Sequence, residues 1–420
     1  MRLTHLLLGC LAALSQASDI NISKPQLSKK ILPTKFKPPA VFENVNLVRN
    51  INLEKSYPRE TINVVIKNVG KEPQSEYYLP FETDLMSRVG GLEVRDRKDI
   101  GKPPFKTDIT TFDEQKYAKP TNLNSLAVEL ISVIVSPVEY IRIHLPKPLE
   151  PKAELTLGIS YHILAALKPR PAAIEQMDKH YVQYDFSAYS PSAYKTSKQK
   201  TKIKFPTTDI PDYTTLAATS EGENPSKQGS TFMYGPFDAV PAGAVEPVSV
   251  RYEYTHPLLH CTSLERDIEI SHWGGNLAIE ERYWLTNRAA ELKNHFSRVQ
   301  WQMSQYANPP TSALRELRVP LKIGSANPYY TDDVGNVSTS RWRSNAKEAM
   351  LELRPRYPLF GSWNYSFKIG WDANLNTFLK NLKGGHHYSL TVPFLEGPKM
   401  SGGITYDRVD VRVILPEGAK

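Results

Sequence analysis

The feature of this chain that most constrains its fold is an alternation of apolar and polar residues that recurs along its length. Residues 248–254 place valine or tyrosine at every second position, and the same period of two occurs at 62–66, 155–161 and 409–413. Side chains of a β-strand point alternately to opposite faces, so each segment would bury one face and expose the other to water. Such strands are typical of antiparallel sheets that pack as sandwiches or curved saddles.

Composition and length favour the same fold class. The chain has 33 prolines and 22 tyrosines among 420 residues. Proline interrupts helices, whereas tyrosine favours strands. A chain of this length also exceeds what one hydrophobic core usually supports. The sequence therefore predicts a mainly β protein with two tandem antiparallel β-sandwich or saddle-like domains and few short helices.

The two expected domains meet at a stretch rich in Thr, Ser, Pro and Gly. Residues 207–230 have the composition of a linker or a long loop, which gives an N-terminal domain at 18–233 and a C-terminal domain at 234–420. The best helix candidate is 289–303, where apolar residues recur at helical spacing. The apolar stretch 126–138 is short and predicts a buried strand.

The N-terminus has the layout of a secretory signal peptide. A short basic start precedes the apolar residues 3–14, and small residues lead to a cleavage site after Ala17. The apolar run is shorter than the roughly 20 residues that cross a bilayer core. We therefore expect residues 1–17 to be removed as a signal peptide, so that the mature chain begins at Ser18.

The formal net charge of +8 suggests nucleic acid as a partner. The basic residues, however, are not gathered on a recognisable nucleic-acid-binding element, so no nucleic-acid partner is expected. The densest basic cluster runs from Lys195 to Lys204. In an extended strand its alternate residues would share one face: Lys198, Lys200, Lys202 and Lys204. We interpret this face as solvated. Attraction to an acidic partner or to an anionic membrane surface is the functional alternative.

Catalytic motifs are missing from the sequence. It has no HExxH run for a zinc peptidase, no GxSxG elbow, and neither GxGxxG nor a P-loop to cradle phosphates. No two aspartates are separated by one residue, as the metal-binding motif of many sugar-nucleotide transferases would require. We therefore expect no catalytic residue, no cofactor and no metal site.

Two groups of histidines are candidate metal ligands. His256 and His260 lie close to Cys261, but residues four apart in a strand are over ten ångströms distant, at about 3.3 Å per residue. His386 and His387 are adjacent and would face opposite ways on a strand. We interpret both groups as structural. Cys261 is the only cysteine outside the signal peptide and is expected to be a packed core residue, with a reactive thiol as the alternative.

Two further segments have a structural and a functional interpretation. Residues 272–275 (HWGG) fit a buried tryptophan at a glycine turn, and the alternative is a platform for sugar rings. Residues 354–358 (RPRYP) fit an extended edge segment that proline keeps from pairing with another strand. Their two arginines could instead fork onto an acidic partner.

Three N-glycosylation sequons are present, and they gain meaning from the expected signal peptide, which routes the chain to the compartment of modification. The acceptors are Asn21, Asn336 and Asn364. Asn336 follows a turn-rich stretch and is expected to be exposed. Asn364 lies between Trp363 and Tyr365, which favours burial in a packed strand. We therefore predict higher occupancy at Asn336 than at Asn364.

Several longer segments are distinctive, in this order along the chain: YKTSKQKTK at 194–202, YGPFDAVPA at 234–242, IEISHWGGNLAIEERYWL at 268–285, GNVSTS at 335–340, RPRYPLFGSW at 354–363 and VRVILPEGAK at 411–420. None of them encodes a known chemistry. As an ordered set they resemble the ribophorin I family, which is subunit 1 of the oligosaccharyltransferase of the endoplasmic reticulum. The resemblance is strongest from residue 234 onward.

The resemblance implies a non-catalytic subunit in the endoplasmic reticulum lumen, attached to the membrane of that organelle. In this family a separate multi-span subunit catalyses the transfer of oligosaccharide from dolichol to asparagine. The luminal domains of the ribophorin-like subunit support that catalytic subunit and help to present unfolded substrate. The implied partners are the catalytic and accessory subunits, the nascent polypeptide and the translocon. Membrane association is expected through partners or through a family-type C-terminal anchor beyond 411–420, which this sequence lacks. The match of GNVSTS also favours a glycan on Asn336.

Two functions of other classes remain as alternatives. One is a secreted β-rich hydrolase or peptidase-like protein with an unrecognised site, which the metal content of the purified protein would reveal. The other is a soluble secreted binding module. Release into the medium, rather than retention in the reticulum, would distinguish that module from a complex subunit.

Overall fold

The structure is a computed structural model that describes residues 30–32, 36–99, 101–112, 138–219, 222–271, 274–307, 309–383 and 387–419. The expected signal peptide and Asn21 lie outside these ranges, as does the strand expected at 126–138, apart from Val138. The chain is mainly β and its strands pair mostly antiparallel, which confirms the predicted fold class. No helix among the described residues is long and apolar enough to span a membrane.

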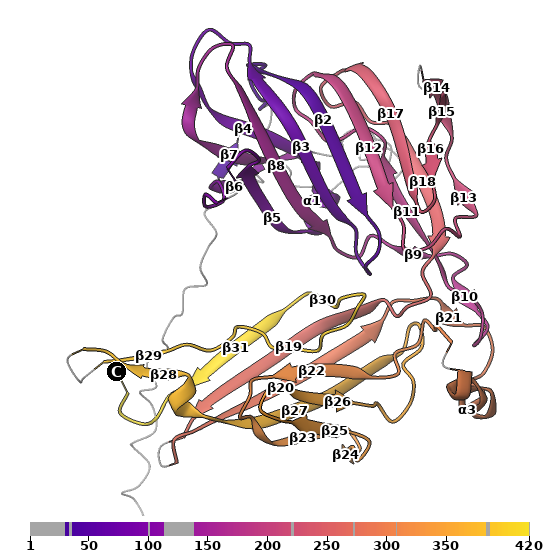
Figure 1. Cartoon of the computed structure of the whole chain (residues 1–420), viewed down its shortest axis with the longest axis vertical. Helices are drawn as coiled ribbons and strands as arrows, with labels where there is room; N and C mark the ends of the chain where they lie inside the picture. Colours follow the sequence, from indigo (N-terminus) through magenta and orange to yellow (C-terminus); the bar gives the residue numbers. More distant parts are fainter. Residues whose placement is uncertain are drawn as a thin grey trace, which may run out of the picture.

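The N-terminal unit (residues 30–253) is built on a sheet of seven strands (Figure 1). In spatial order these are β16 (Ser226–Gln228), β17 (Thr231–Val240), β12 (Thr196–Lys204), β2 (Phe42–Asn52), β3 (Arg59–Asn68), β8 (Glu154–Ile163) and β5 (Val89–Asp96). Strands β12 and β2 run parallel, and the other neighbours are antiparallel.

Two smaller sheets pack on one face of this seven-stranded sheet. The first contains β1 (Lys30–Leu32), β6 (Thr107–Phe112), β7 (Val138–Leu149) and β4 (Gln74–Glu82). The second contains β13 (Asp212–Tyr213), β18 (Pro247–Glu253), β11 (Tyr181–Ser187) and β9 (Lys168–Pro169). A further hairpin pairs β14 (Leu216–Thr219) with β15 (Gly222–Asn224), so the segment expected as a linker carries four short strands.

The apolar residues of the alternating segments form the core of the N-terminal unit. Strand β3 buries every second residue, and Ile62 and Val64 pack in one apolar cluster with Leu79 and Phe81 of β4. Val250 of β18 belongs to a second cluster, between the second small sheet and β12, β17 and β2. Each strand therefore contributes one apolar face to a core between sheets, as the period of two predicts.

The C-terminal unit (residues 259–414) repeats this plan with a second large sheet (Figure 1). Its strands are β24 (Gly335–Asn336), β23 (Ala326–Asp332), β27 (Asn364–Asn374), β20 (Asn276–Asn287) and β19 (Leu259–Ile270), with β30 (Thr405–Tyr406) and β31 (Val409–Ile414) parallel to β19. The sheet of β22 (Leu317–Leu321), β26 (Ala349–Leu353) and β25 (Arg341–Ser344) covers its apolar face. Strands β28 (Leu379–Asn381) and β29 (Tyr388–Leu390) form a separate hairpin.

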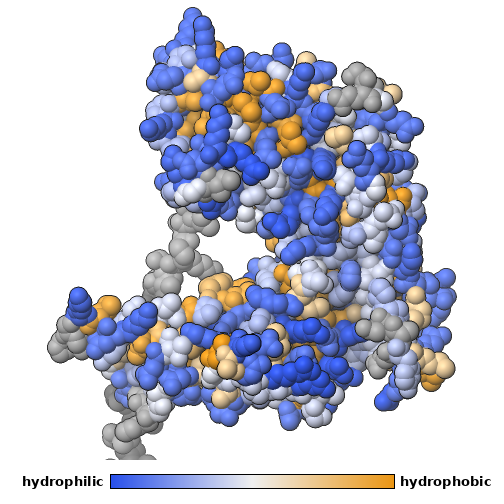
Figure 2. Space-filling view, viewed as in Figure 1, coloured by the Kyte–Doolittle hydropathy of each residue, from blue (hydrophilic) through white to orange (hydrophobic). Residues whose placement is uncertain are grey.

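The two units meet along one side of the molecule, and the space between them is open on the other side (Figure 2). At the junction, β10 (Ala173–Ile174) pairs in parallel with β21 (Glu291–Leu292). The buried His180 completes the contact, because its Nδ1 lies 2.7 Å from the carbonyl oxygen of Tyr254 while its Nε2 accepts the N–H of Ala290 at 3.0 Å. The chain passes from one set of sheets to the other between β18 and β19.

In the part of the chain that the structure describes, helices are few and short: α1 (Thr83–Met86), α3 (Arg298–Ala307) and the 3₁₀ turn η2 (Leu375–Thr377). The helix expected at 289–303 is wrong in its first half, because Glu291 and Leu292 form β21 instead. Pairing with β10 outweighs the local helical spacing there. In α3, Trp301 is buried, as is Ser304, whereas Val299 is exposed.

Candidate functional site

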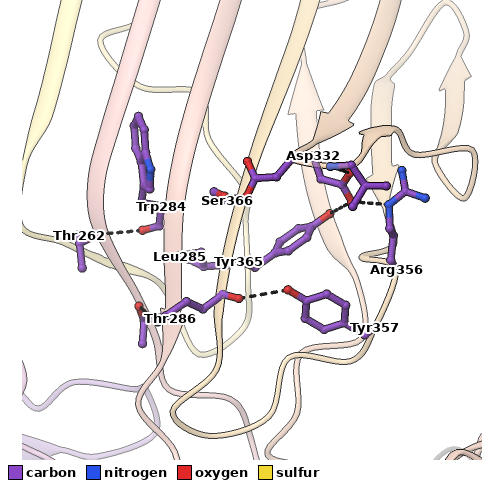
Figure 3. Close-up of a pocket in the computed structure, with 12 residues that line it drawn as sticks. Thr262, Trp284, Leu285, Thr286, Asp332, Arg356, Tyr357, Tyr365 and Ser366 are labelled. Carbon is purple, nitrogen blue, oxygen red and sulfur yellow. Dashed lines mark hydrogen bonds and ion pairs between the residues drawn. The ribbon is translucent and has the colours of Figure 1, made fainter.

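A pocket of about 550 Å³ opens on the C-terminal sheet (Figure 3). Neighbouring parts of β19, β20 and β27, the turn after β23 and the segment before β27 form its wall: Thr262, Trp284, Leu285, Thr286, Asp332, Asp333, Val334, Arg356, Tyr357, Asn364, Tyr365 and Ser366. Trp284 follows the buried Tyr283 and precedes the buried Leu285, so its indole leaves the sheet on the face away from the core. Residues from two of the segments quoted above, 268–285 and 354–363, lie together in this wall.

Arg356 fixes the turn beside the pocket. Its Nε donates to Asp332, and its Nη2 donates to the carbonyl oxygens of Gly335 at 3.2 Å and Asn336 at 2.8 Å. Burial opposes ionisation of Asp332, but the guanidinium of Arg356 and two backbone N–H groups outweigh it and lower the pKa of the carboxyl group. Arg356 therefore binds an acidic group of its own chain through one hydrogen bond, and its two bonds to carbonyl oxygens hold residues 335 and 336 beside the pocket.

Aromatic rings and hydroxyl groups face each other across the pocket. Figure 3 shows Trp284 and Tyr357 on opposite sides of it. Both are partly exposed, at 36% and 39%, and the Tyr357 hydroxyl donates to the carbonyl oxygen of Asn364 at 3.2 Å. Between them, Ser366 donates to the carboxylate of Asp333. Flat apolar faces beside a few polar groups are typical of a binding site for a small polar ligand.

Both carboxylates of the pocket have hydrogen-bond partners. Asp332 pairs with Arg356, and Asp333 accepts the hydroxyl of Ser366. Acid–base or nucleophilic catalysis needs a nucleophile next to a base, and these contacts do not provide that arrangement. The geometry is suited to binding.

Both described sequon acceptors lie close to this pocket. Asn336 is exposed in β24, as expected. The expected burial of Asn364 is wrong, because β27 begins at this residue and only the following Tyr365 turns into the core. Asn364 is exposed, and its Oδ1 accepts the hydroxyl of Thr286 at 2.8 Å.

The residues weighed as metal ligands do not converge. His260 contacts Thr405 and Asp407, at 2.9 and 2.7 Å, while His256 is exposed. Cys261 is buried as predicted, and burial raises the pKa of its thiol to about 12. Within the ranges given above, no three His, Cys, Asp or Glu side chains form a metal-binding group.

Other candidates from the sequence are placed as follows. Three residues lie outside the described ranges: His272, Trp273 and His386. Lys198, Lys202 and Lys204 are exposed on β12 and Lys200 is partly exposed, while the residues between them are buried, which confirms that the four share one face. Lys204 pairs with Glu54 at 2.7 Å. Arg354 is exposed and only approaches Glu316, at 3.8 Å.

Gly361, in the segment before β27, has no room for a side chain. A Cβ atom there would lie 2.0 Å from the carbonyl oxygen of Ala290 and 2.4 Å from that of Ala289. We expect Gly361→Ala to lower the free energy of unfolding by about 3 kcal/mol, because the backbone must shift to relieve the overlap. The measurement is urea unfolding of the full chain, followed by tryptophan fluorescence.

Gly370→Ala is the matched control for this substitution. A Cβ at Gly370 would meet the ring of Tyr329 at 2.3 Å, but Tyr329 is 42% exposed and can swing away from the sheet. We expect a loss below about 1.5 kcal/mol. Equal losses at the two glycines would contradict a backbone constraint at Gly361.

The Ribophorin I family model matches residues 42–420 of this chain. The Schizosaccharomyces pombe protein named dolichyl-diphosphooligosaccharide–protein glycosyltransferase subunit 1 is 29% identical over 383 residues, which cover 90% of this chain and 77% of that protein. Subunit 1B of Arabidopsis thaliana is 31% identical and covers 90% and 75%. Subunit 1 of Caenorhabditis elegans is 36% identical over 279 residues and covers 66% and 46%.

Among solved structures, yeast LTA4 hydrolase in complex with bestatin matches 54% of this chain and 31% of its own, with 11% identity and a TM-score of 0.31. An M1 zinc metallopeptidase from Deinococcus radiodurans matches 55% and 48%, with 9% identity and a TM-score of 0.26. Likeness at this level carries no argument about the function of this chain.

Proposed function

The chain belongs to the ribophorin I family, and we propose that it is a non-catalytic subunit of the oligosaccharyltransferase complex. In this role it supports the transfer of a dolichol-linked oligosaccharide to asparagines of nascent proteins. The observation that carries the proposal is the family match over residues 42–420. It is joined by relatives whose alignments cover 90% of the chain and which are named subunit 1 or 1B of this transferase. These names do not favour the secreted hydrolase or the secreted binding module.

The site chemistry supports a binding role for this subunit. The carboxylates of Asp332 and Asp333 are held by Arg356 and Ser366, and aromatic rings form much of the remaining wall. We propose a location in the endoplasmic reticulum lumen, with membrane attachment through partner subunits or through a family-type anchor. The nascent polypeptide and the translocon are the further partners that this placement suggests.

Affinity purification of the tagged full-length gene product from its native host tests this function. After mild detergent extraction, we expect a multi-span catalytic subunit and other oligosaccharyltransferase subunits to co-purify in near-stoichiometric amounts. An unrelated tagged luminal glycoprotein is the control for incidental capture. Recovery of the chain from the culture medium, free of these membrane proteins, would overturn the proposal.

The sequons provide an independent prediction about compartment. Asn336 and Asn364 are both exposed, so the folded chain accommodates a bulky glycan at either position. We therefore propose glycans on both, and on Asn21, and the reason for expecting lower occupancy at Asn364 no longer applies. Glycopeptide mass spectrometry of native material is the measurement. Unmodified asparagine at all three positions would contradict a luminal location.

A further inference from the structure

We propose that the pocket on the C-terminal sheet is the docking site for the first sugars of the chain's own glycan, attached at Asn364. The inference rests on the luminal location in the proposed function, because the modification occurs there. It assigns an occupant to the pocket and a structural role to one of the sequons.

The residue that carries the attachment atom, Asn364, lines the pocket. Thr286 holds the Oδ1 of Asn364 at 2.8 Å, and no partner for its Nδ2 occurs among the described residues. In the modification, the anomeric carbon of a polyprenyl-diphosphate-linked oligosaccharide forms a bond to Nδ2. The bond from that carbon to the diphosphate oxygen breaks, the polyprenyl diphosphate leaves, and the amide nitrogen loses one proton. The glycan therefore begins at an atom on the rim.

A flat aromatic surface lies next to this atom. Tyr357, Trp363 and Asn364 together line a smaller hollow of about 280 Å³. The rings of Tyr357 and Trp363 meet edge to face, with centroids 5.9 Å apart, and Tyr365 supports Tyr357 from another side at 5.7 Å. The Tyr357 ring is thus held in place before any ligand arrives, which lowers the entropic cost of stacking a sugar ring on it.

The larger pocket continues from this hollow. Tyr357 and Asn364 line both cavities, so a glycan that starts at Asn364 passes from one into the other. Further along, the Asp333 carboxylate can accept hydroxyl groups of a sugar, and Trp284 forms the opposite side (Figure 3). The volume of about 550 Å³ is within the range of roughly 300–1,000 Å³ typical of small-molecule sites.

The test is the rate at which an amidase that cleaves the bond between glycan and asparagine acts on the native full-length glycoprotein. Release in heavy-oxygen water marks each asparagine, so mass spectrometry follows Asn336 and Asn364 in one sample. A docked glycan is cleaved only from its undocked fraction, so we expect release at Asn364 to be at least about tenfold slower than at Asn336. In denatured protein the two rates should agree.

Two variants connect this protection to the pocket. Tyr357→Ala removes the stacking surface and is expected to bring release at Asn364 to within about twofold of Asn336, since the undocked fraction then dominates. Tyr357→Phe keeps the ring and should keep the protection. A cooperative urea unfolding transition like that of the wild type shows that Tyr357→Ala is folded, and Trp284→Ala provides a second removal of pocket surface.

Three results would overturn the inference. The first is an unoccupied Asn364 beside an occupied Asn336, which leaves the luminal location intact. The second is equal release at both sites of the native wild-type protein. The third is protection of Asn364 that persists in Tyr357→Ala and in Trp284→Ala. If neither asparagine is modified, the luminal location fails together with the inference.

Discussion

Arg266→Met is expected to lower the free energy of unfolding by about 3–5 kcal/mol, because it leaves two buried carboxylates without their cation. Arg266 is fully buried on β19. Its Nη1 donates to Glu281, and its Nη2 donates to Glu396 at 2.8 Å. Glu281 is fully buried as well, and it also accepts the hydroxyl of Tyr283 at 2.6 Å. Urea unfolding of the full chain is the measurement.

The matched control is Arg412→Met on the neighbouring strand β31. Arg412 donates to both carboxylate oxygens of Asp267, at 2.6 and 2.8 Å, but its side chain is 60% exposed. Water screens an exposed pair, so we expect a loss below about 1 kcal/mol. Comparable losses in the two variants would show that burial does not control the effect of Arg266.

The loss in Arg266→Met should depend on pH in a defined direction. Burial raises the pKa of Glu281 in the native protein, and Arg266 opposes that shift. Without the arginine the pKa rises further, so folding takes up a proton and stability falls as pH rises above the ordinary range of a carboxylic acid. We expect a smaller defect at pH 5 than at pH 7.5. An equal defect at both values would contradict this.

Glu60→Leu, in the N-terminal unit, is expected to lower the free energy of unfolding by about 3–5 kcal/mol as well. The reason is that Arg49 then stays buried without its carboxylate partner. Arg49 donates to Glu60 through Nε at 2.9 Å and Nη2 at 2.8 Å. Tyr161 and Tyr184 donate to the same carboxylate at 2.6 and 3.0 Å. These groups come from β2, β3, β8 and β11, so the cluster links the central sheet to the small sheet on its face.

The double variant Arg49→Met/Glu60→Leu separates an unpaired charge from lost packing. Apolar replacements for a buried ion pair are often tolerated, so we expect the double variant to be more stable than Glu60→Leu alone by at least about 2 kcal/mol. A double variant whose loss equals the sum of both single losses would show no coupling between Arg49 and Glu60, and would contradict an unpaired charge as the cause.

The strands could be predicted because their signal is local. The alternating segments at 62–66, 155–161 and 409–413 lie within β3, β8 and β31. Their partners could not be predicted, since β12 pairs in parallel with β2 from a distant part of the chain. The helix at 289–303 failed for a related reason, because the competing pairing of β21 with β10 depends on tertiary structure.

The pocket was only partly visible in the sequence. The outward direction of Trp284 can be read from its place between the inward Tyr283 and Leu285. Tyr357 gave no such signal, because it lies outside the strands and its position depends on the contact of Arg356 with Asp332. Asn364 was misjudged because its aromatic neighbours indicated burial, whereas alternation at the start of β27 turns it outward.

The junction between the two units has a consequence for how this protein can diverge in evolution. The parallel pairing of β10 with β21 uses main-chain atoms. The two hydrogen-bond partners of the His180 imidazole, the carbonyl oxygen of Tyr254 and the N–H of Ala290, also belong to the main chain. Such bonds tolerate most side-chain replacements, because every residue except proline supplies the same donor and acceptor. Replacements on the surface of either unit should therefore leave the pairing of β10 with β21 intact.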